Sequence, residues 1–419
     1  MIASMTTNTL RPGIILVLAI LVLSATLSAA VEMPAIRFNK NFEAGALGKI
    51  EKLGDSQFRC YVEGQCDEHG RNRQANWYYF EMLGVKGREI TLTLTDFVGE
   101  YNGQPGACPM TPETIPVFSN DNRSWRHFAS MRWDDQKKEA TLRFTPEQDV
   151  IWIAHVPPYP YSRVLRLLEE VNSEACVRLE VIGKTAQGRD LHLVTVTAPQ
   201  TPDDHKKTVW LIVRQHAWET GTSYVLEGAL RFISSNTSAA RAWRDRVVFK
   251  FVPTMDPDGC AVGHVRFNAN GYDLNRHWDE VDLHTKELLE RMPEIWSVKK
   301  SILAYSDSGH SIDLLLNMHN DEMPEYLDTQ VADEHGQQVL QRLFSTLTAN
   351  TSFYPNSKLR ISSKPDPTTN WLYQERKIPV ATMEQRIGPS NKLGRQPTVE
   401  DRLEFGSHLI EAMADAVTR

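Results

Sequence analysis

The sequence is poor in cysteine and has no two cysteines in a C-x-x-C spacing. Its 419 residues contain five, which are Cys60, Cys66, Cys108, Cys176 and Cys260. So few scattered cysteines exclude a disulfide scaffold, and the missing spacing excludes a cysteine zinc knuckle. Cys60 and Cys66 are the nearest candidates for a disulfide in an oxidising compartment, but buried free thiols fit the sequence equally well.

An excess of positive charge is also missing. The chain has 46 Lys and Arg against 53 Asp and Glu, a formal net charge of −7. Nucleic-acid-binding domains normally carry clustered basic surface, so we expect no nucleic-acid partner. Peptides and small molecules stay compatible as substrates.

Long apolar runs are absent after the first thirty residues, where one does occur. Arg11 precedes an apolar run from Ile14 to Leu23, which fades into small residues at 28–30. This layout predicts a signal peptide over residues 1–30, hence export to the periplasm or the medium and no stable membrane association after cleavage. A retained N-terminal membrane anchor is the alternative, but the run falls short of the roughly 20 residues that a span requires.

The chain is long enough for two domains of the usual size, about 100 to 200 residues each. Residues 36–157 contain short segments that alternate apolar with polar residues between turn-forming residues, which predicts a smaller all-β sandwich domain. The expected strands are Phe58 to Val62, Trp77 to Leu83, Glu89 to Asp96, Ala140 to Phe144 and Val150 to Ala154. Pro157, Pro158 and Pro160 lack backbone N–H groups and cannot continue a central strand, so we place the domain junction there.

Residues 161–419 predict an α/β domain with a mixed sheet covered by helices. A predicted hairpin turning at Gln187-Gly188 is followed by strands rich in Val, Ile and Leu, which alternate with amphipathic stretches. The strands are expected at Val209 to Val213, Val247 to Val252 and Ile312 to Met318, and the helices at Val164 to Val171, Ser223 to Ile233, Asp282 to Trp296, Gln337 to Leu347 and Val399 to Val417.

Candidate metal ligands lie near the ends of two of these strands. His216 and Glu219 are three residues apart after the first strand, and His319 follows the third. Each motif alone is weak, because H-x-x-E is frequent and an isolated histidine is more often an ordinary polar residue. Together, two imidazoles and one carboxylate leave a fourth position for water, as a catalytic zinc ion requires.

The most specific segment lies between these ligands. It contains P-D-G at 257–259, then Arg266, then G-Y-D-L-N-R-H-W at 271–278. This pattern resembles the zinc metallocarboxypeptidases related to carboxypeptidase A, more closely the cytosolic-carboxypeptidase branch that trims glutamates from protein tails. The segment 369–384, which ends at Glu384, resembles that family's closing segment, in which a strand delivers the catalytic glutamate. The N-W-Y-Y-F run at 76–80 is similar to the branch's N-terminal domain.

The resemblance implies a carboxypeptidase-like fold, one zinc ion and a role for each residue. A zinc-bound water would attack the scissile carbonyl with a glutamate as general base, and the substrate would be the C-terminal tail of a peptide or protein. The implied metal ligands are His216, Glu219 and His319, the catalytic residues are Glu384 as base and Arg266 on the oxyanion, and the residues binding the substrate's terminal carboxylate are Asn275 and Arg276.

Several positions depart from the family pattern or leave the specificity open. Ser362 stands where pancreatic-type enzymes carry a mobile tyrosine, and Ala217-Trp218 replaces the more usual Pro-Gly. Lys364 and Arg386 lie near the expected side-chain pocket, where a cation would favour an acidic C-terminal residue. Plain solvent exposure is the alternative for Lys364.

Two other functions also fit parts of the sequence. A cell-wall peptide carboxypeptidase or amidase would keep the zinc ligands without needing Asn275 and Arg276. A non-catalytic module that binds peptide C-termini would not need Glu384.

Overall fold

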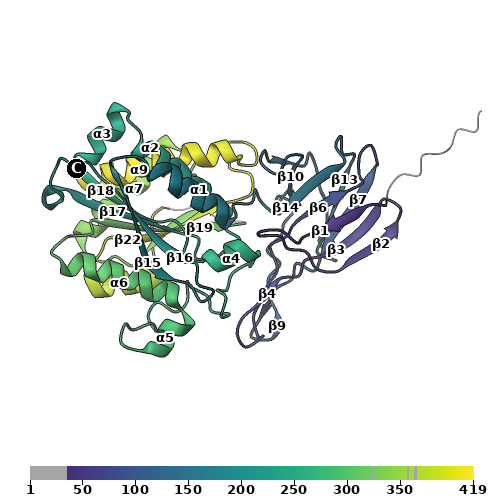
Figure 1. Cartoon of the computed structure of the whole chain (residues 1–419), viewed down its shortest axis with the longest axis horizontal. Coiled ribbons are helices and arrows are strands. Elements are labelled where there is room, and N and C mark those ends of the chain that lie inside the picture. Colours follow the sequence, from purple (N-terminus) through teal and green to yellow (C-terminus); the bar gives the residue numbers. More distant parts are fainter. Residues whose placement is uncertain (1–34, 323–324, 356–357, 363–365) are drawn as a thin grey trace, which may run out of the picture. The chain divides into compact units, whose positions relative to one another are not determined.

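The computed structural model describes residues 35–322, 325–355, 358–362 and 366–419. Residues 36–419 form one compact unit, in which β elements up to Ala154 precede a region of alternating helices and strands (Figure 1). The predicted signal peptide and Lys364 lie outside the described residues. Within the described ranges, we find no helix that is both long and apolar enough to cross a membrane.

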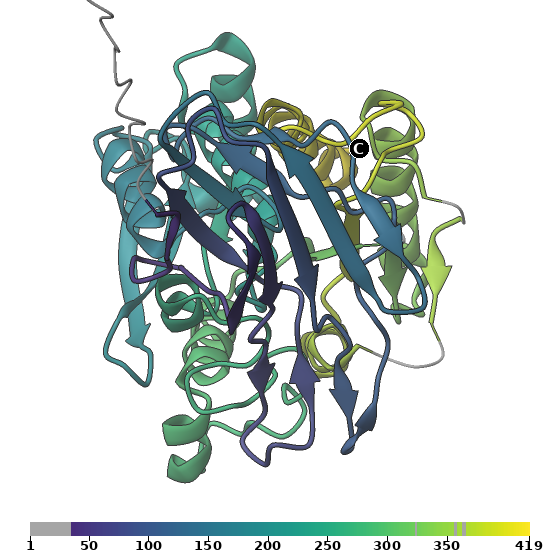
Figure 2. The same ribbon diagram turned by 90° about the vertical axis from the view of Figure 1, so that its right-hand side faces the viewer.

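The N-terminal domain is built from two five-stranded sheets, which Figure 2 views from the side of that domain. In β7, Ile90, Leu92 and Leu94 point into the core while Thr91 and Thr93 lie partly exposed, as the period of two in a strand requires. The predicted all-β sandwich is therefore confirmed. One sheet has the order β1 (Arg37–Asn39), β6 (Tyr79–Leu83), β14 (Val150–Ala154), β10 (Val117–Ser119) and β11 (Arg126–His127); the other has β12 (Arg132–Asp134), β13 (Glu139–Phe144), β7 (Ile90–Thr95), β3 (Gln57–Tyr61) and β2 (Ile50–Gly54).

A small third sheet extends from this domain. Its strands are β4 (Gln65–Cys66), β5 (Arg73–Gln74), β8 (Glu100–Tyr101) and β9 (Gln104–Pro105). Cys66 is exposed on β4, whereas Cys60 is buried in the sandwich core, and all five cysteines are free thiols. The pairing considered for Cys60 and Cys66 is not formed.

The second domain is organised around an eight-stranded mixed sheet. Its order is β15 (Val177–Lys184), β16 (Asp190–Val196), β18 (Val247–Val252), β17 (Lys207–Val213), β19 (Leu314–Asp321), β22 (Val380–Arg386), β20 (Tyr326–Thr329) and β21 (Arg360–Ile361). The central strands β18, β17, β19 and β22 are parallel and almost wholly buried, because helices cover both faces. The predicted mixed α/β sheet is confirmed.

Each predicted amphipathic stretch is helical, but one of them is divided, and the helices α3, α4 and α8 were not predicted. The expected helix at Asp282 to Trp296 is divided, since α5 ends at Arg291 and α6 begins at Pro293, whose missing N–H suits a first helical position. The helices are α1 (Tyr161–Val171), α2 (Thr220–Ser234), α3 (Ser238–Arg244), α4 (Pro257–Val262), α5 (Lys286–Arg291), α6 (Pro293–Asp307), α7 (Glu334–Asn350), α8 (Pro367–Arg376) and α9 (Val399–Thr418), with a short 3₁₀ turn at Asp203–His205.

Two glycines allow α2 and α9 to pack unusually closely. A Cβ added at Gly228 would lie 1.9 Å from the backbone oxygen of Leu403, and one added at Gly406 would lie 1.9 Å from that of Val225. The two backbones therefore touch where a side chain would otherwise separate them. This contact fixes α2, the helix that starts directly after Glu219.

Candidate active site

A sharp turn after β17 presents the first two predicted ligands. Arg214 has a positive φ of 59°, which non-glycine residues rarely adopt. Its buried guanidinium donates to the Ser223 hydroxyl at 2.9 Å and to the backbone oxygens of Tyr159 and Ala217. The turn places His216 beside Glu219, the residue that precedes the first turn of α2.

The predicted metal ligands meet in one buried cluster. Nδ1 of His216 lies 2.6 Å from Oε1 of Glu219, and Nδ1 of His319 lies 2.9 Å from its Oε2. Ligand atoms of the three residues all lie within 4.8 Å of one another. His319 lies inside β19, which extends to Asp321, and not beyond the strand as we expected. Two imidazole nitrogens and one carboxylate are the donor set of a catalytic zinc site, so these residues fit one zinc ion.

Asp273 supports this cluster from outside, although the sequence assigned it no role. Its Oδ1 lies 3.0 Å from Nε2 of His216, and its Oδ2 accepts a hydrogen bond of 2.6 Å from Nε of Arg266. Burial works against ionisation, but the charges of Arg266 and His216 hold the pKa of the Asp273 carboxyl well below its ordinary value. A carboxylate on the free nitrogen of a ligand histidine orients the ring for metal binding.

Asn275 is held rigidly by a buried hydrogen-bond network. Its Oδ1 accepts from the Thr368 hydroxyl at 2.6 Å and from Nε2 of Gln215 at 3.2 Å, while its Nδ2 donates to Asp366 at 2.7 Å. Gln215 is itself fixed by a hydrogen bond of 2.8 Å from the indole N–H of Trp278. Sequence analysis missed Gln215, Asp366 and Thr368, because no local motif links residues so far apart in the chain.

Strand β22 brings Glu384 close to the cluster of predicted metal ligands. In the parallel pairing of β19 and β22, Glu384 lies opposite His319. Its Oε2 is buried and has no hydrogen-bond partner among the described residues. Burial raises the pKa of the Glu384 carboxyl well above its ordinary value, and the nearby carboxylates of Glu219 and Asp321 raise it further.

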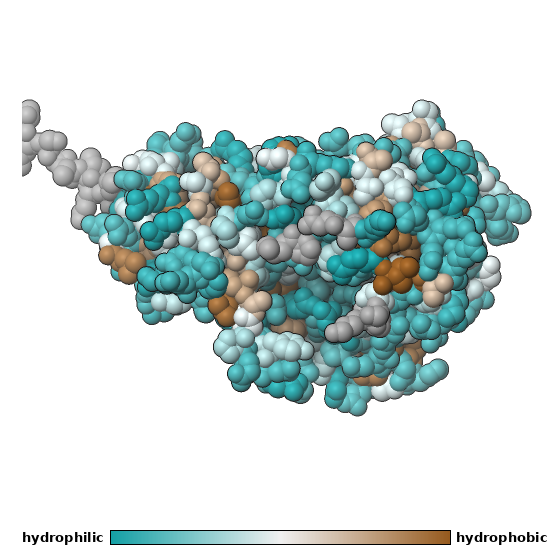
Figure 3. All heavy atoms as spheres, turned by 180° about the vertical axis from the view of Figure 1, so that it is seen from behind, coloured by the Kyte–Doolittle hydropathy of each residue, from teal (hydrophilic) through white to brown (hydrophobic). Residues whose placement is uncertain are grey.

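These residues surround a cleft of about 630 Å³. All the predicted site residues line it except His319, which is fully buried. The lining residues are Gln74, Asn76, Pro109, His216, Trp218, Glu219, Arg266, Asn275, Arg276, Asn320, Asp321, Glu322, Tyr326, Asp328, Gln330, Asp366, Pro367, Thr382 and Glu384. The first three belong to the N-terminal domain, so both domains form the cleft. The face of the molecule in Figure 3 is largely hydrophilic, with only separate small apolar areas.

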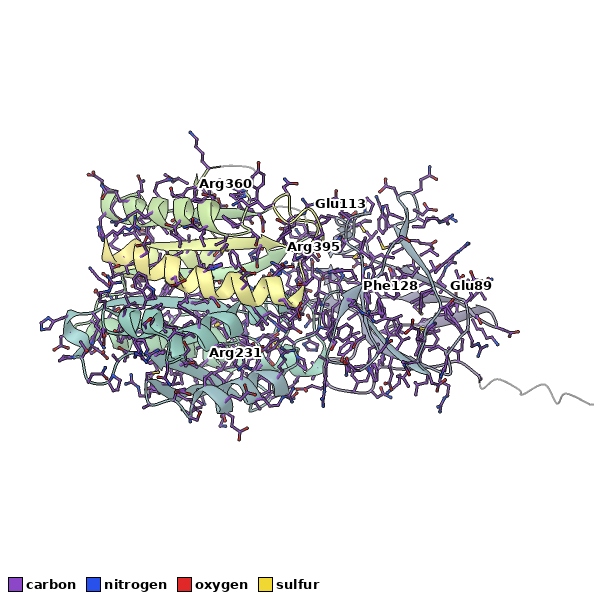
Figure 4. All side chains as sticks on the ribbon, turned by 90° about the horizontal axis from the view of Figure 1, so that it is seen from above. Glu89, Glu113, Phe128, Arg231, Arg360 and Arg395 are labelled. Carbon is purple, nitrogen blue, oxygen red and sulfur yellow. The ribbon has the colours of Figure 1, made fainter. Side chains whose placement is uncertain are left out.

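Arg386, one of the two basic residues expected near the substrate's side-chain pocket, points towards the N-terminal domain. It donates to the carboxylate of Glu113 in that domain, and it is not among the described residues that line the cleft. Figure 4 labels Glu113 where the two domains meet, and its backbone oxygen also accepts from the side chain of Gln396. Ser362, which stands where related enzymes carry a tyrosine, donates its backbone N–H to the backbone oxygen of Thr329. A tyrosine not identified from the sequence, Tyr326, lines the cleft next to Glu384 on the neighbouring strand.

Comparison with known proteins agrees with this geometry. Residues 163–322 match the zinc carboxypeptidase family, and residues 38–156 match the cytosolic carboxypeptidase N-terminal domain. An uncharacterized protein of Zymomonas mobilis is 29% identical over 289 residues, 68% of either chain. Mouse cytosolic carboxypeptidase 3 is 29% identical over 310 residues, which cover 65% of this chain but only 29% of that longer protein.

Among solved structures, a metallo-carboxypeptidase from Burkholderia cenocepacia has the same fold. The TM-score is 0.78 at 24% identity, over 91% of this chain and 99% of that one. The two family matches adjoin at the proline-rich segment between the domains, and the first includes all three zinc ligands. This chain belongs to the zinc carboxypeptidase family, as a metallocarboxypeptidase with an intact His-Glu-His zinc site and an N-terminal domain of the cytosolic carboxypeptidase type.

Proposed function

We propose that this protein hydrolyses the last peptide bond of peptides or protein tails that have a free C-terminus. The supporting observation is that Glu384, Arg276 and Asn275 line the same cleft as the zinc ligands His216 and Glu219. A site of this composition has a group for each task of a carboxypeptidase within one cavity.

Glu384 is the proposed general base. Zinc held by His216, Glu219 and His319 supplies Lewis acidity, which lowers the pKa of water and polarises a carbonyl. Glu384 takes a proton from the attacking water at Oε2, which has no partner among the residues that the structure describes, and returns it to the leaving amine.

Arg266 and Arg276 are the proposed partners of two negatively charged groups, the oxyanion of the transition state and the terminal carboxylate of the substrate. Arg266 is fixed through Nε by Asp273, so that its other N–H groups serve the oxyanion formed in the transition state. The guanidinium of Arg276 makes one hydrogen bond within the described part of the chain, from NH1 to the backbone oxygen of Asn275 at 2.7 Å. Its remaining N–H groups are available to grip both oxygens of a terminal carboxylate, with Asn275 beside it.

The proposal is tested with matched peptides that have free or amidated C-termini. We expect chelator-sensitive release of the last amino acid from the free-ended peptides only, since an amide offers Arg276 no carboxylate. The Arg276→Ala variant should lower kcat/KM for free-ended peptides by about 10- to 1000-fold, while an Arg166→Ala variant on the exposed face of α1 should not change it. Equal cleavage of both sets by the unmodified protein would rule out carboxypeptidase activity.

The same experiment separates the two other candidate functions. A cell-wall amidase would cleave without regard to Arg276, and a binding module would retain the free-ended peptide without releasing an amino acid. The presence of Glu384 and Arg276 in one cleft favours the carboxypeptidase over both.

We also propose that the protein is exported, on the basis of the sequence pattern at residues 11–30. Cell fractionation and N-terminal sequencing of the exported protein test this. A first residue near Val31 would support cleavage, whereas a chain that remains in the membrane fraction with residues 1–30 intact would identify an anchor.

A further inference from the structure

A single side chain of the N-terminal domain holds the backbone around Arg266. Oε1 of Gln65 accepts hydrogen bonds from the backbone N–H groups of Val265, Arg266 and Phe267, at 3.0, 2.8 and 2.9 Å. Nε2 of the same side chain donates to the backbone oxygen of Phe267 at 2.6 Å. Four hydrogen bonds thus join Gln65 to three consecutive residues that lie about 200 positions later in the chain.

These backbone groups depend on Gln65 because no regular structure satisfies them. Residues 264–266 lie outside every helix and strand, and Phe267 takes part only in an isolated bridge with Asp273. Val265 and Phe267 are buried, where an N–H group without an acceptor is strongly unfavourable. Removing the oxygen of Gln65 would force this segment to rearrange so that its N–H groups find other acceptors.

The hairpin that carries Gln65 also contacts the far end of the same segment. The backbone N–H of Glu68 donates to the oxygen of Gly271 at 3.2 Å. Gly271 has a φ of 86°, and a Cβ there would lie 2.4 Å from the Glu68 nitrogen. The N-terminal domain therefore contacts this segment at two places, at residues 265–267 and at Gly271.

We infer that Gln65 is a positioning residue for catalysis, which sets the location of the Arg266 guanidinium from the N-terminal domain. Gln65 fixes the backbone of Arg266, and Asp273 fixes its Nε at 2.6 Å. The side chain is held at both ends, so its free N–H groups have a defined direction before substrate binds. This inference rests on the oxyanion role proposed for Arg266, and it gives the N-terminal domain a part in the reaction that is exerted through Arg266.

The Gln65→Met and Gln65→Glu variants of the whole, zinc-loaded protein test this inference. Met keeps the volume of the side chain but has no oxygen, so we expect kcat to fall about 10- to 100-fold, with KM within about threefold, since a group that acts only in the transition state affects kcat. Glu keeps an acceptor for the three N–H groups and should retain most of the turnover. Both variants should still bind one zinc ion per chain, and Gln57→Met, at an exposed glutamine of the same domain, should behave as the unmodified protein.

A second measurement shows whether Gln65 acts through Arg266. In an Arg266→Ala background, Gln65→Met should change kcat by less than about twofold, because the group that it positions is gone. An equal loss of kcat in both backgrounds would overturn the inference, as would normal turnover by a folded Gln65→Met protein. If Gln65→Met melts below the assay temperature, Gln65→Asn, which withdraws the amide by one methylene, takes its place with the same expected outcomes.

The Arg266→Ala variant also separates the inference from the proposed function. If that variant alone keeps normal turnover, the role proposed for Arg266 is wrong and the inference falls with it. If Arg266→Ala loses turnover and Gln65→Met does not, only the inference about Gln65 is wrong.

Discussion

His319 and Glu384 lie opposite each other on the adjacent parallel strands β19 and β22. One is a zinc ligand and the other the proposed general base, so hydrogen bonding within the sheet sets their separation. A shift of one residue in this pairing would turn Glu384 to the other face of the sheet, because side chains alternate along a strand. The backbone of the sheet therefore determines the spacing between metal and base.

The first prediction concerns Glu384→Gln. The amide cannot accept the proton of the attacking water, so we expect kcat to fall by about 10²- to 10⁴-fold. Zinc content should stay at one ion per chain, because Glu384 is not among the clustered ligands. The measurements are amino-acid release from a free-ended peptide and metal analysis. Glu404→Gln, an exposed position on α9, is the control, and near-normal turnover by Glu384→Gln would mean that another group is the base.

The second prediction concerns zinc removal. His216 and Glu219 lie in the turn between β17 and α2, His319 lies in β19, and all three are buried, so a bound ion joins that turn to β19. A chelator should abolish activity and lower Tm, and one equivalent of zinc should restore both, since a ligand that binds only the folded state stabilises it. His319→Ala should lose the zinc-dependent rise in Tm, whereas the exposed His335→Ala should keep it. An unchanged Tm on chelation would contradict a structural contribution from the ion.

The third prediction is a pH dependence of stability due to Glu294. This carboxyl is fully buried on α6, and its Oε1 has no partner among the described residues. Burial, with a smaller contribution from Asp256, raises its pKa to about 8. In the unfolded chain, the Glu294 carboxyl ionises at a lower pH than it does in the folded protein. The favourable contribution of the neutral carboxyl is therefore complete below about pH 4.5 and is lost as the pH rises to about 8.

The variant Glu294→Gln removes this ionisation and tests the third prediction. Its stability relative to the unmodified protein should rise by at most about 1.4 kcal/mol for each pH unit between 4.5 and 8, and then level off. Denaturant unfolding at several pH values measures the difference. A difference that stays constant across this range would show that Glu294 ionises normally in the folded protein.

The fourth prediction concerns the close contact of α2 and α9. Gly406→Ala would place a Cβ 1.9 Å from the backbone oxygen of Val225, so the helices must separate. We expect a loss of about 1 to 3 kcal/mol in the free energy of unfolding, as for other overpacked positions. Gly54→Ala, where the added Cβ would lie 3.5 Å from Gln57, is the control and should be nearly neutral. Equal effects of the two substitutions would argue against the contact.

The sequence predicted those parts of the site that lie in short local patterns. His216 and Glu219 share one turn, and Asn275 lies in a motif of eight residues, so each was recognisable without knowledge of the fold. Asp273 stood in the same motif, but its contact with His216 spans 57 positions and has no local signal. Gln65 was missed for the same reason, since its partners at 265–267 come together only when the two domains pack.

The strands of the second domain were predicted because their hydrophobic pattern is regular. Contacts between the two domains were not predicted, because they depend on residues far apart in the sequence. The buried strands β17, β18 and β19 are apolar runs that indicate a covered sheet. Arg386 was expected near the pocket for the substrate's side chain. It instead forms an ion pair with Glu113, 273 positions away, which only the packing of the N-terminal domain provides.

Strand β22 is an internal strand of the sheet, between β19 and β20, although it is later in the chain than either. During synthesis, the ligands up to His319 therefore leave the ribosome before the strand that carries Glu384. The sheet cannot be completed by adding that strand at an edge, because β20 has to lie beyond it. Nascent chains that end between residues 320 and 383 thus possess every zinc-binding side chain but lack Glu384, the proposed base, so we expect no peptide cleavage until most of the polypeptide has been made.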